Sequence, residues 1–276
     1  MRRRRPGERG FVLVAVLWLG VALAIAASGF LGTARRESYR VRAEIESAHA
    51  VEIARTALNL AMADLGRPDG ARRSPRDGTP VIVPVPGGEA RFRIRDEKGK
   101  VDLNRAPVTL LAGTLQRLGA GGLDAVDYAS LADRLLALAR EARESGAAPS
   151  LPELLARAGL SQSVASRAAL VLTLHNYGPR INPETAPPEV LAAVPSMGAE
   201  DLEAILEARR LGEPLPVLGA AQGWFENNEG PVYSIHTTGR TANGVSATIM
   251  AMVLSDGRGF RSGRRRFRIL EARVLR

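Results

Sequence analysis

Few residues of this chain have the type and spacing that catalysis or metal binding requires. The sequence contains no cysteine, which excludes disulfides, thiolate nucleophiles and cysteine-ligated metals. Its three histidines, His49, His175 and His236, are too scattered to form a metal-ligand pair. Ser234 and His236 share one face of an expected strand, but the sequence places no carboxylate beside them to complete a catalytic triad. The chain is therefore predicted to be non-enzymatic, with His49 in a structural role.

Three aspartates, Asp124, Asp127 and Asp133, are the best candidates for binding a cation, and structural calcium is one interpretation. Their spacing matches no calcium-binding loop, so the acidic start of a helix is the preferred interpretation. The glycine-rich run at 119–122 ends an expected helix instead of following a strand, which argues against a phosphate loop. We therefore expect no cofactor.

The chain is strongly basic, with a net charge of +9 and a pI near 10.9. Such a balance raises nucleic acid as a partner, but the basic residues gather at the two ends of the chain and the middle is mixed or acidic. Only Lys98 and Lys100 are lysines, and every other basic side chain is arginine. The run Arg258–Arg276 contains eight arginines with apolar residues between them, which favours a strand with polar edges. Contact of this run with anionic lipid or an acidic partner stays open.

The N-terminus predicts a membrane anchor. Residues 1–10 (MRRRRPGERG) form a short basic leader, and the 21 residues from Phe11 to Leu31 carry no charge. A helix of that length spans about 30 Å, the thickness of the bilayer hydrocarbon core, and it is too long for a cleavable signal peptide. We expect 11–31 to be a transmembrane segment with its N-terminus in the cytoplasm, because arginines precede it.

The same helix is expected to continue through an amphipathic half at 32–66. No glycine or proline occurs between Thr33 and Leu65, and Gly66 and Pro68 end the helix. Apolar residues recur every three or four positions and predict one face that packs on a domain. The residues of this stripe are Val41, Ile45, Ala48, Val51, Ala54, Leu58, Ala61 and Leu65.

The middle of the chain contains an internal repeat at a spacing of 80 residues. Val101–Leu111 (VDLNRAPVTLL) aligns without gaps on Ile181–Leu191 (INPETAPPEVL). Each copy indicates an extended segment, a polar turn, a proline in the first helical turn and then apolar helical positions. The motif residues are Asp102, Asn104, Ala106 and Pro107 in the first copy, and Asn182, Glu184, Ala186 and Pro187 in the second. Further helices are expected at about 110–118, 128–144, 151–174, 189–194 and 200–210.

Strand patterns lie on both sides of this helical block. Before it, 81–85 and 90–96 predict strands; after it, 232–238, 245–255 and 266–274 do so. The apolar run 247–254 indicates a central strand that packs against the long helix. The expected fold class is α+β: a long N-terminal helix on an antiparallel sheet formed by 67–100 and 215–276, with an all-α domain inserted at 101–214.

A basic leader that ends in Gly10, an aromatic Phe11, an apolar span and an amphipathic continuation together resemble a type IV prepilin or pseudopilin. The resemblance covers essentially the whole chain. It implies cleavage by prepilin peptidase between Gly10 and Phe11, followed by N-methylation of Phe11. Most members of this superfamily carry glutamate at the fifth mature position, which is Ala15 here. Loss of that glutamate, together with a helical insert, is typical of the minor pseudopilin K family of type II secretion systems.

That resemblance implies a non-enzymatic subunit at the tip of the secretion pseudopilus, which nucleates or caps its assembly for protein export across the outer membrane. It implies as partners the minor pseudopilins I and J, prepilin peptidase, the inner-membrane secretion platform and inner-membrane lipid. The expected location is a single pass through the inner membrane with a periplasmic soluble domain. The sequence does not reveal which proteins are exported.

An alternative is a membrane-tethered DNA-binding protein of a competence system, because the repeat also resembles the start of helix-hairpin-helix modules. Such modules use a glycine-rich hairpin whose amides contact phosphate. The corresponding segment here, Val194–Gly198, has one glycine, and Glu200, Asp201 and Glu203 follow it. These acidic residues would repel a phosphate backbone, so we expect no nucleic acid partner.

Overall fold

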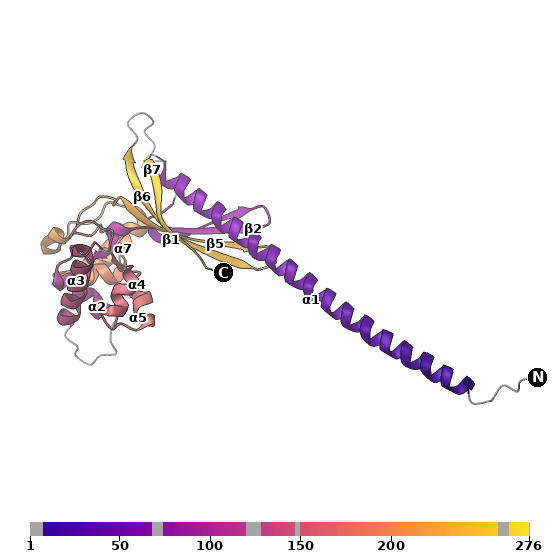
Figure 1. The fold of residues 1–276 in the computed structure, drawn as a ribbon. Helices are drawn as coiled ribbons and strands as arrows, with labels where there is room; N and C mark the ends of the chain where they lie inside the picture. Colours follow the sequence, from indigo (N-terminus) through magenta and orange to yellow (C-terminus); the bar gives the residue numbers. More distant parts are fainter. Residues whose placement is uncertain (1–7, 68–73, 120–127, 147–149, 259–264, 276) are drawn as a thin grey trace, which may run out of the picture.

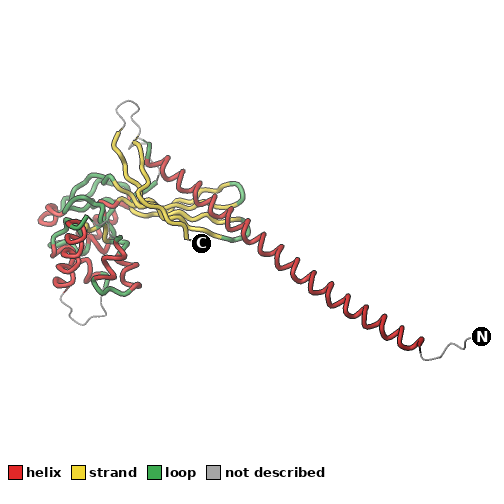
Figure 2. Tube along the Cα trace, viewed as in Figure 1, coloured by secondary structure: helices red, strands yellow, loops and turns green. Residues whose placement is uncertain are grey.

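A computed structural model of the 276-residue chain describes residues 8–67, 74–119, 128–146, 150–258 and 265–275. Side chains are described for the same residues apart from 8–13, 26–35, 256–258 and 265–266. One long helix lies across a sheet and projects far beyond it, and a group of short helices lies at the end of the sheet remote from the N-terminus (Figure 1). Figure 2 shows how strands and short helices occupy separate regions. The prediction of a mixed α+β fold with an antiparallel sheet is confirmed.

The sheet contains five strands in the order β1-β2-β5-β6-β7, and every neighbouring pair is antiparallel. The chain leaves the sheet after β2 and returns at β5, so the helical insert interrupts a simple meander. Strands β2 and β5, which flank the insert in the sequence, are paired without a bulge, from Gly88 opposite Thr241 to Asp96 opposite Tyr233. The strands are β1 (Asp77–Val85), β2 (Gly88–Asp96), β5 (Val232–Thr241), β6 (Ser246–Arg258) and β7 (Arg265–Leu275).

The long helix α1 (Glu8–Leu65) packs its last four turns on one face of the sheet. Its small and aliphatic side chains form a core with Phe92, Ile94, Tyr233 and Ile235, all of which are buried. Helix and sheet approach closely at Gly239, where an added Cβ atom would lie 2.2 Å from the carbonyl oxygen of Ala50. Glycine is required there because the backbone of α1 occupies the space of a side chain.

The apolar stripe of α1 packs on the sheet only in its second half. Its residues from Val51 to Leu65 are buried, whereas Val41 and Ile45 are 45% and 62% exposed. Ala50 and Val51 still pack against Ala247 of β6, and the helix then projects beyond the end of the sheet (Figure 1). The expectation that the whole stripe packs on the domain was therefore wrong for Val41, Ile45 and Ala48.

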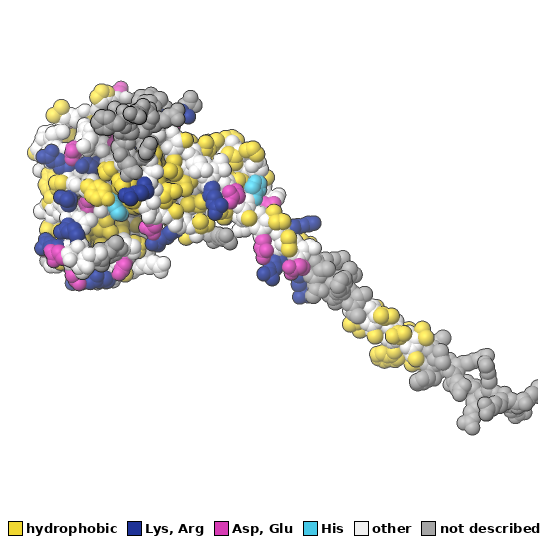
Figure 3. Space-filling view, turned by 45° about the horizontal axis from the view of Figure 1, so that its top comes forward, with side chains coloured by type: hydrophobic (Ala, Val, Ile, Leu, Met, Phe, Trp, Pro, Cys, Tyr) yellow, Lys and Arg dark blue, Asp and Glu magenta, His cyan; other side chains and the backbone are white. Residues whose placement is uncertain are grey.

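The projecting part of α1 has two zones of different polarity among its described side chains, and Figure 3 shows both. Charged side chains occupy the zone next to the sheet, and residues 14–25 farther out are uncharged and exposed. Within the part of the chain that the structure describes, no helix is long and apolar enough to cross a membrane. The expected span 11–31 includes residues 11–13 and 26–31, whose side chains lie outside that part.

The insert between β2 and β5 is mostly helical. In the described residues it contains six α-helices, two short parallel strands and two 3-10 turns. These elements are η2 (Glu97–Gly99), β3 (Val101–Asp102), α2 (Val108–Arg117), α3 (Tyr128–Glu144), α4 (Leu151–Arg157), α5 (Gln162–Ala168), β4 (Leu172–Thr173), α6 (Pro188–Leu191), α7 (Ala199–Leu211) and η3 (Gly219–Trp224).

Two expectations for this region differ from the structure. The expected helical stretch 151–174 is divided into α4, α5 and strand β4, because Gly159 and Leu160 end the first helix and Ser161 caps the second. The core of the insert also extends beyond residue 214, since Leu218, Ala221 and Phe225 are buried in it.

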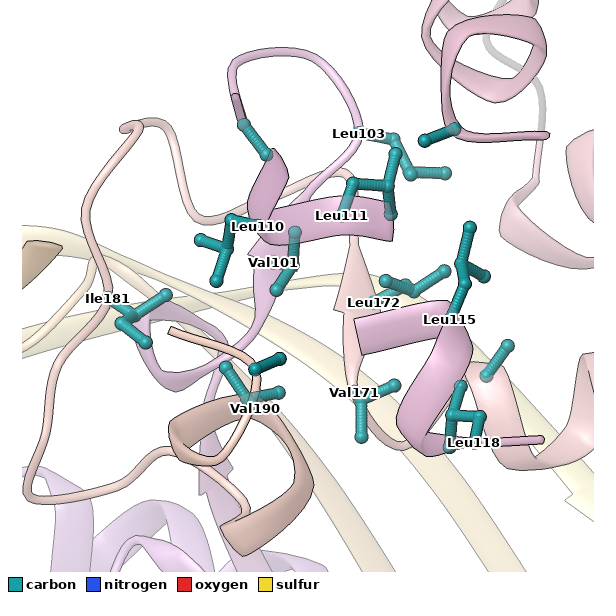
Figure 4. Close-up of a cluster of buried hydrophobic side chains, with 14 of the residues drawn as sticks. Val101, Leu103, Leu110, Leu111, Leu115, Leu118, Val171, Leu172, Ile181 and Val190 are labelled. Carbon is teal, nitrogen blue, oxygen red and sulfur yellow. The ribbon is translucent and has the colours of Figure 1, made fainter. Parts of the chain in front are cut away.

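The insert has its own hydrophobic core, separate from the one between α1 and the sheet. Figure 4 shows side chains from both copies of the repeat in this core: Val101 and Leu110 from the first, Ile181 and Val190 from the second. All four are no more than 1% exposed. Equivalent apolar positions of the two copies therefore build one shared core.

Candidate functional site

The two copies of the repeat fold into the same turn. In the first copy, the Asp102 carboxylate accepts a hydrogen bond from the Asn104 amide (2.8 Å), and the backbone carbonyl of Asp102 accepts one from the Ala106 amide (2.8 Å). A short acceptor side chain that bonds an amide two residues later stabilises such turns. Asp102 also accepts a hydrogen bond from the Tyr177 amide, although burial raises the pKa of this carboxyl group.

The second copy uses asparagine for the same purpose. The Asn182 side-chain oxygen accepts from the Glu184 amide (3.0 Å), and the Asn182 carbonyl accepts from the Ala186 amide (3.0 Å). Pro107 and Pro187 each stand at the N-cap of the following helix; the expected proline in the first helical turn is present in the second copy, as Pro188, but not in the first. Proline suits this position because its missing N–H leaves no unsatisfied donor.

The extended segments before these turns also correspond. Val101 pairs in parallel with Leu172, and Ile181 pairs in parallel with Phe225. The helices that follow meet at equivalent positions, where a Cβ atom on Gly113 would lie 3.0 Å from the carbonyl oxygen of Ala193. The repeat therefore gives two similar half-units that pack against each other.

A buried polar junction joins the insert to the sheet, where the chain leaves β2 and returns to β5. The Asp96 carboxylate accepts hydrogen bonds from the amides of Lys98 (2.9 Å) and Gly230 (3.2 Å), and from the side chain of Asn182 (3.4 Å). Burial raises the pKa of Asp96, and these three donors oppose that rise. Lys98 reaches Glu226 with 2.9 Å between Nζ and Oε2. These contacts connect the segment that leaves β2 to the segment that enters β5.

The centre of this junction is an ion pair between Glu97 and Lys100. Oε1 of Glu97 lies 2.7 Å from Nζ of Lys100, and the side chains are only 1% and 7% exposed. The hydroxyl groups of Thr173 and Ser234 donate to the same carboxylate. Burial alone would raise the pKa of Glu97, but attraction to Lys100 and these hydrogen bonds together hold it below its usual value.

The junction places the Glu97 carboxylate beside Ser234, a contact that the sequence did not predict. It does not form a catalytic triad, because the Glu97 carboxylate binds the serine directly and His236 lies farther along the strand. Burial, together with repulsion from Lys100 and Arg95, lowers the pKa of His236. The arrangement can fix the insert relative to the sheet, but it offers no activated nucleophile.

The remaining candidates for chemistry do not come together. His49 is exposed on α1 beside Gly87, and His175 lies near Asp102 and Tyr177. Among the described residues, no group of three histidine or acidic side chains could hold a metal ion. Asp133 is exposed on α3, whereas Asp124 and Asp127 lie outside the described residues.

The positions tied to leader processing lie on the projecting end of α1. The backbone of Gly10 and Phe11 is helical, and their side chains lie outside the described residues. Ala15 is exposed on the same helix. Cleavage and methylation at this point stay a prediction.

Sequence reasoning missed the junction, although one signal was available. The run from Asp96 to Lys100 holds both lysines of the chain beside two acids and Gly99. A Cβ atom on Gly99 would lie 2.7 Å from the amide nitrogen of Ala186, so this segment approaches the second repeat turn closely. Charged residues concentrated around such a glycine indicate a packed crossing of two chain segments.

A long helix on a five-stranded antiparallel sheet, with an inserted helical unit, defines a pseudopilin-like fold. Comparison with protein-family models finds no match, and comparison with curated proteins finds none either. Among solved structures, the fold is similar to that of GspK in the GspK–GspI–GspJ complex from the enterotoxigenic Escherichia coli type 2 secretion system. The TM-score is 0.53 at 16% identity, and the match covers 86% of this chain and 99% of that chain. This likeness concerns the fold alone.

Proposed function

We propose that the chain is a minor pseudopilin of a type II secretion system, of the K family, and that it occupies the tip of the pseudopilus. The observation that carries the proposal is the combination of long helix, antiparallel sheet and helical insert, which matches GspK over 99% of that chain. Its role is structural and not enzymatic. It assembles with the minor pseudopilins I and J, as the composition of the neighbour's complex supports.

Assembly uses the part of α1 that the sheet leaves uncovered. Tyr39, Val41 and Ile45 are exposed there, at 70%, 45% and 62%. Exposed aliphatic and aromatic side chains at helical spacing suit contact with neighbouring helices. The insert lies at the opposite end of the molecule (Figure 1), where its bulk hinders stacking of another subunit above it.

Membrane attachment is part of the same proposal and rests on the sequence. The apolar segment 11–31 anchors the chain in the inner membrane, with the leader in the cytoplasm and the sheet and insert in the periplasm. Prepilin peptidase removes residues 1–10, and the new Phe11 amine is methylated. The secretion platform in the inner membrane then receives the subunit for assembly.

Ala15 provides the sharpest test of a tip position. A tip subunit has no neighbour above it whose amino group could pair with an acid at this depth, so Ala15→Glu should leave a carboxylate unpaired in lipid at a cost of several kcal/mol. We expect the full-length A15E variant to lose co-purification with minor pseudopilins I and J and to reduce secretion. The control Ala15→Val keeps the position apolar and should behave as the parent. Normal secretion by A15E would exclude the tip position.

Leader processing is tested separately with Gly10→Ala. We expect the parent chain, recovered from cells with its prepilin peptidase, to begin at Phe11 with a methylated amine. The G10A chain should retain residues 1–10. N-terminal mass spectrometry distinguishes the two, and a mature Phe11 terminus on G10A would contradict the prepilin assignment.

DNA binding is not adopted as a second function. Helix α7 begins after Gly198, and the Asp201 carboxylate accepts the Gly198 amide hydrogen bond (3.3 Å). The amide that a helix-hairpin-helix module would present to a phosphate is therefore already bonded to an acid. Glu200 adds a second negative charge in the first turn.

A further inference from the structure

An arginine-rich cleft lies between the sheet and the insert, apart from both the junction and the projecting helix. Its volume is about 720 Å³, and residues of β1, β2 and helices α2, α5, α6 and α7 line it. Five of the lining side chains are arginines and two are acids, Asp77 and Glu189. The arginines are Arg95, Arg117, Arg167, Arg209 and Arg210. The cleft therefore carries an excess of positive charge.

Two of the arginines hold the walls of the cleft in place. Arg95 on β2 donates from Nη1 to the carbonyl oxygen of Leu170 at 3.0 Å, which connects the sheet to the insert. Arg209 on α7 donates from Nη1 to the carbonyl oxygen of Ala186 at 2.8 Å, and from Nη2 to that of Pro183. Burial lowers the pKa of Arg209 to about 10, so its side chain stays charged at neutral pH. These contacts fix the shape of the cleft before any ligand enters.

Two other arginines are available to a ligand. Arg117 and Arg167 are exposed in the last turns of α2 and α5, and neither has a hydrogen-bond or ion-pair partner among the described residues. A cation in the last turn of a helix interacts favourably with the helix dipole, which accounts for the presence of an arginine at each of these two positions. It does not explain why two helix ends and the sheet direct arginines to one cleft.

Apolar groups lie beside this charge. Leu170 lines the cleft and is 50% exposed, and Leu206, Pro187 and Pro188 line it as well. Arginine is enriched in protein interfaces and among the residues that contribute most to binding, and the exposed aliphatic side chains add apolar area that a bound polypeptide can cover. A single strand of nucleic acid would instead require aromatic side chains for base stacking, and none is among the described residues that line the cleft.

We propose that this cleft binds an acidic segment of a partner polypeptide, whose carboxylates pair with Arg117 and Arg167 and whose apolar side chains contact Leu170. Asp77 and Glu189 disfavour a continuous polyanion, but they tolerate a peptide in which carboxylates alternate with other residues. The bound segment contacts both sheet and insert. The proposal goes beyond assembly through α1 and does not depend on it.

Fluorescence anisotropy with the full-length chain tests this binding. The probe is a blocked, fluorescein-labelled peptide of repeated Glu-Glu-Leu, compared with the same peptide carrying glutamine in place of glutamate. We expect the acidic peptide to bind and the glutamine peptide not to bind. Binding should weaken at least about tenfold when salt rises from about 0.01 M to about 1 M, which shortens the Debye length from about 30 Å to about 3 Å.

Matched charge reversals locate the site. Arg117→Glu with Arg167→Glu should weaken peptide binding at least about tenfold, because repulsion replaces two ion pairs. The control is Arg105→Glu with Arg140→Glu, which makes the same change of net charge at two exposed positions of the insert outside the cleft. This control should change the affinity by less than about twofold, since its charges lie away from the ligand.

Three results would overturn the proposal. Equal weakening by both double variants would show that the peptide responds to net charge and does not bind in the cleft. Absence of binding by the parent chain at low salt would show that the cleft does not recognise carboxylates. Equal or tighter binding of an oligothymidylate probe, lost in the Arg117→Glu, Arg167→Glu variant, would assign the cleft to nucleic acid.

Discussion

Removing the Lys100 cation should destabilise the insert more than its size suggests, because the Glu97 carboxylate would stay buried without a partner. The two side chains are 7% and 1% exposed and their charged atoms lie 2.7 Å apart. Removing one member of a buried ion pair costs about 3–5 kcal/mol. We therefore expect Lys100→Met to lower the free energy of unfolding by that amount. Glu97→Gln should have a comparable effect, since it leaves a buried ammonium group.

The double variant measures how much of each single cost comes from the interaction between the two charges. With Lys100→Met and Glu97→Gln together, no uncompensated charge remains, so its cost should fall well below the sum of the two single costs, by about 2–4 kcal/mol. Lys98→Met is the matched control, because its partner Glu226 is 40% exposed. An ion pair in contact with solvent contributes about 0–1 kcal/mol, so this variant should cost little.

Urea unfolding followed by tryptophan fluorescence measures these differences. The chain has two tryptophans, and Trp224 is half-buried beside the junction, whereas Trp18 is exposed on the projecting helix. A Trp18→Phe background makes the signal specific to the insert. The reasoning would be refuted if the cost of the double variant equalled the sum of the two single costs. Equal effects of Lys98→Met and Lys100→Met would refute it as well.

Two further predictions concern the sheet. Burial and nearby cations lower the pKa of His236 below its usual 6.5, so the unfolded chain binds a proton that the folded chain resists. Stability should fall as the pH drops below 6.5 and should level off below the folded pKa; urea midpoints of a His236→Gln variant should lack this slope, and an unchanged slope would exclude His236 as its source. Gly239→Ala should cost at least about 1–3 kcal/mol, because its Cβ atom would lie 2.2 Å from the carbonyl oxygen of Ala50. Gly223→Ala, with nothing within 4 Å of the added atom, should be nearly neutral in the same urea assay, and a similar loss in both variants would contradict a contact-based cause.

Local patterns were enough to predict most elements of the fold. Helix α3 has the expected bounds, 128–144, because its apolar residues recur at helical spacing with no interrupting glycine or proline. The repeat predicted two related turns, since its capping residues act within four positions of each other. Strand β1 begins four residues earlier than expected, at Asp77, because Gly78 and Pro80 disfavour a strand in isolation.

The junction could not be predicted in the same way, because its contacts join residues far apart in the sequence. Glu97 meets Thr173 across 76 positions, and Asp96 meets Gly230 across 134. Pairing of β3 with β4 brings Thr173 to the segment of Glu97, and pairing of β2 with β5 brings Gly230 to that of Asp96. The arginine cleft has the same origin, since its arginines come from a strand and three helices. Periodicity predicts which residues are buried within an element, but not which elements meet.

The two lysines give the folded chain an unusual chemical property. The side chains of Lys98 and Lys100 are 10% and 7% exposed, and each ammonium group is bound to a carboxylate. Reagents that acylate lysine should therefore leave the native protein almost unmodified except at its terminal amine. Any opening between sheet and insert would uncover both amines at once. Their rate of acylation would report that opening directly, with no label introduced and no background from other lysines.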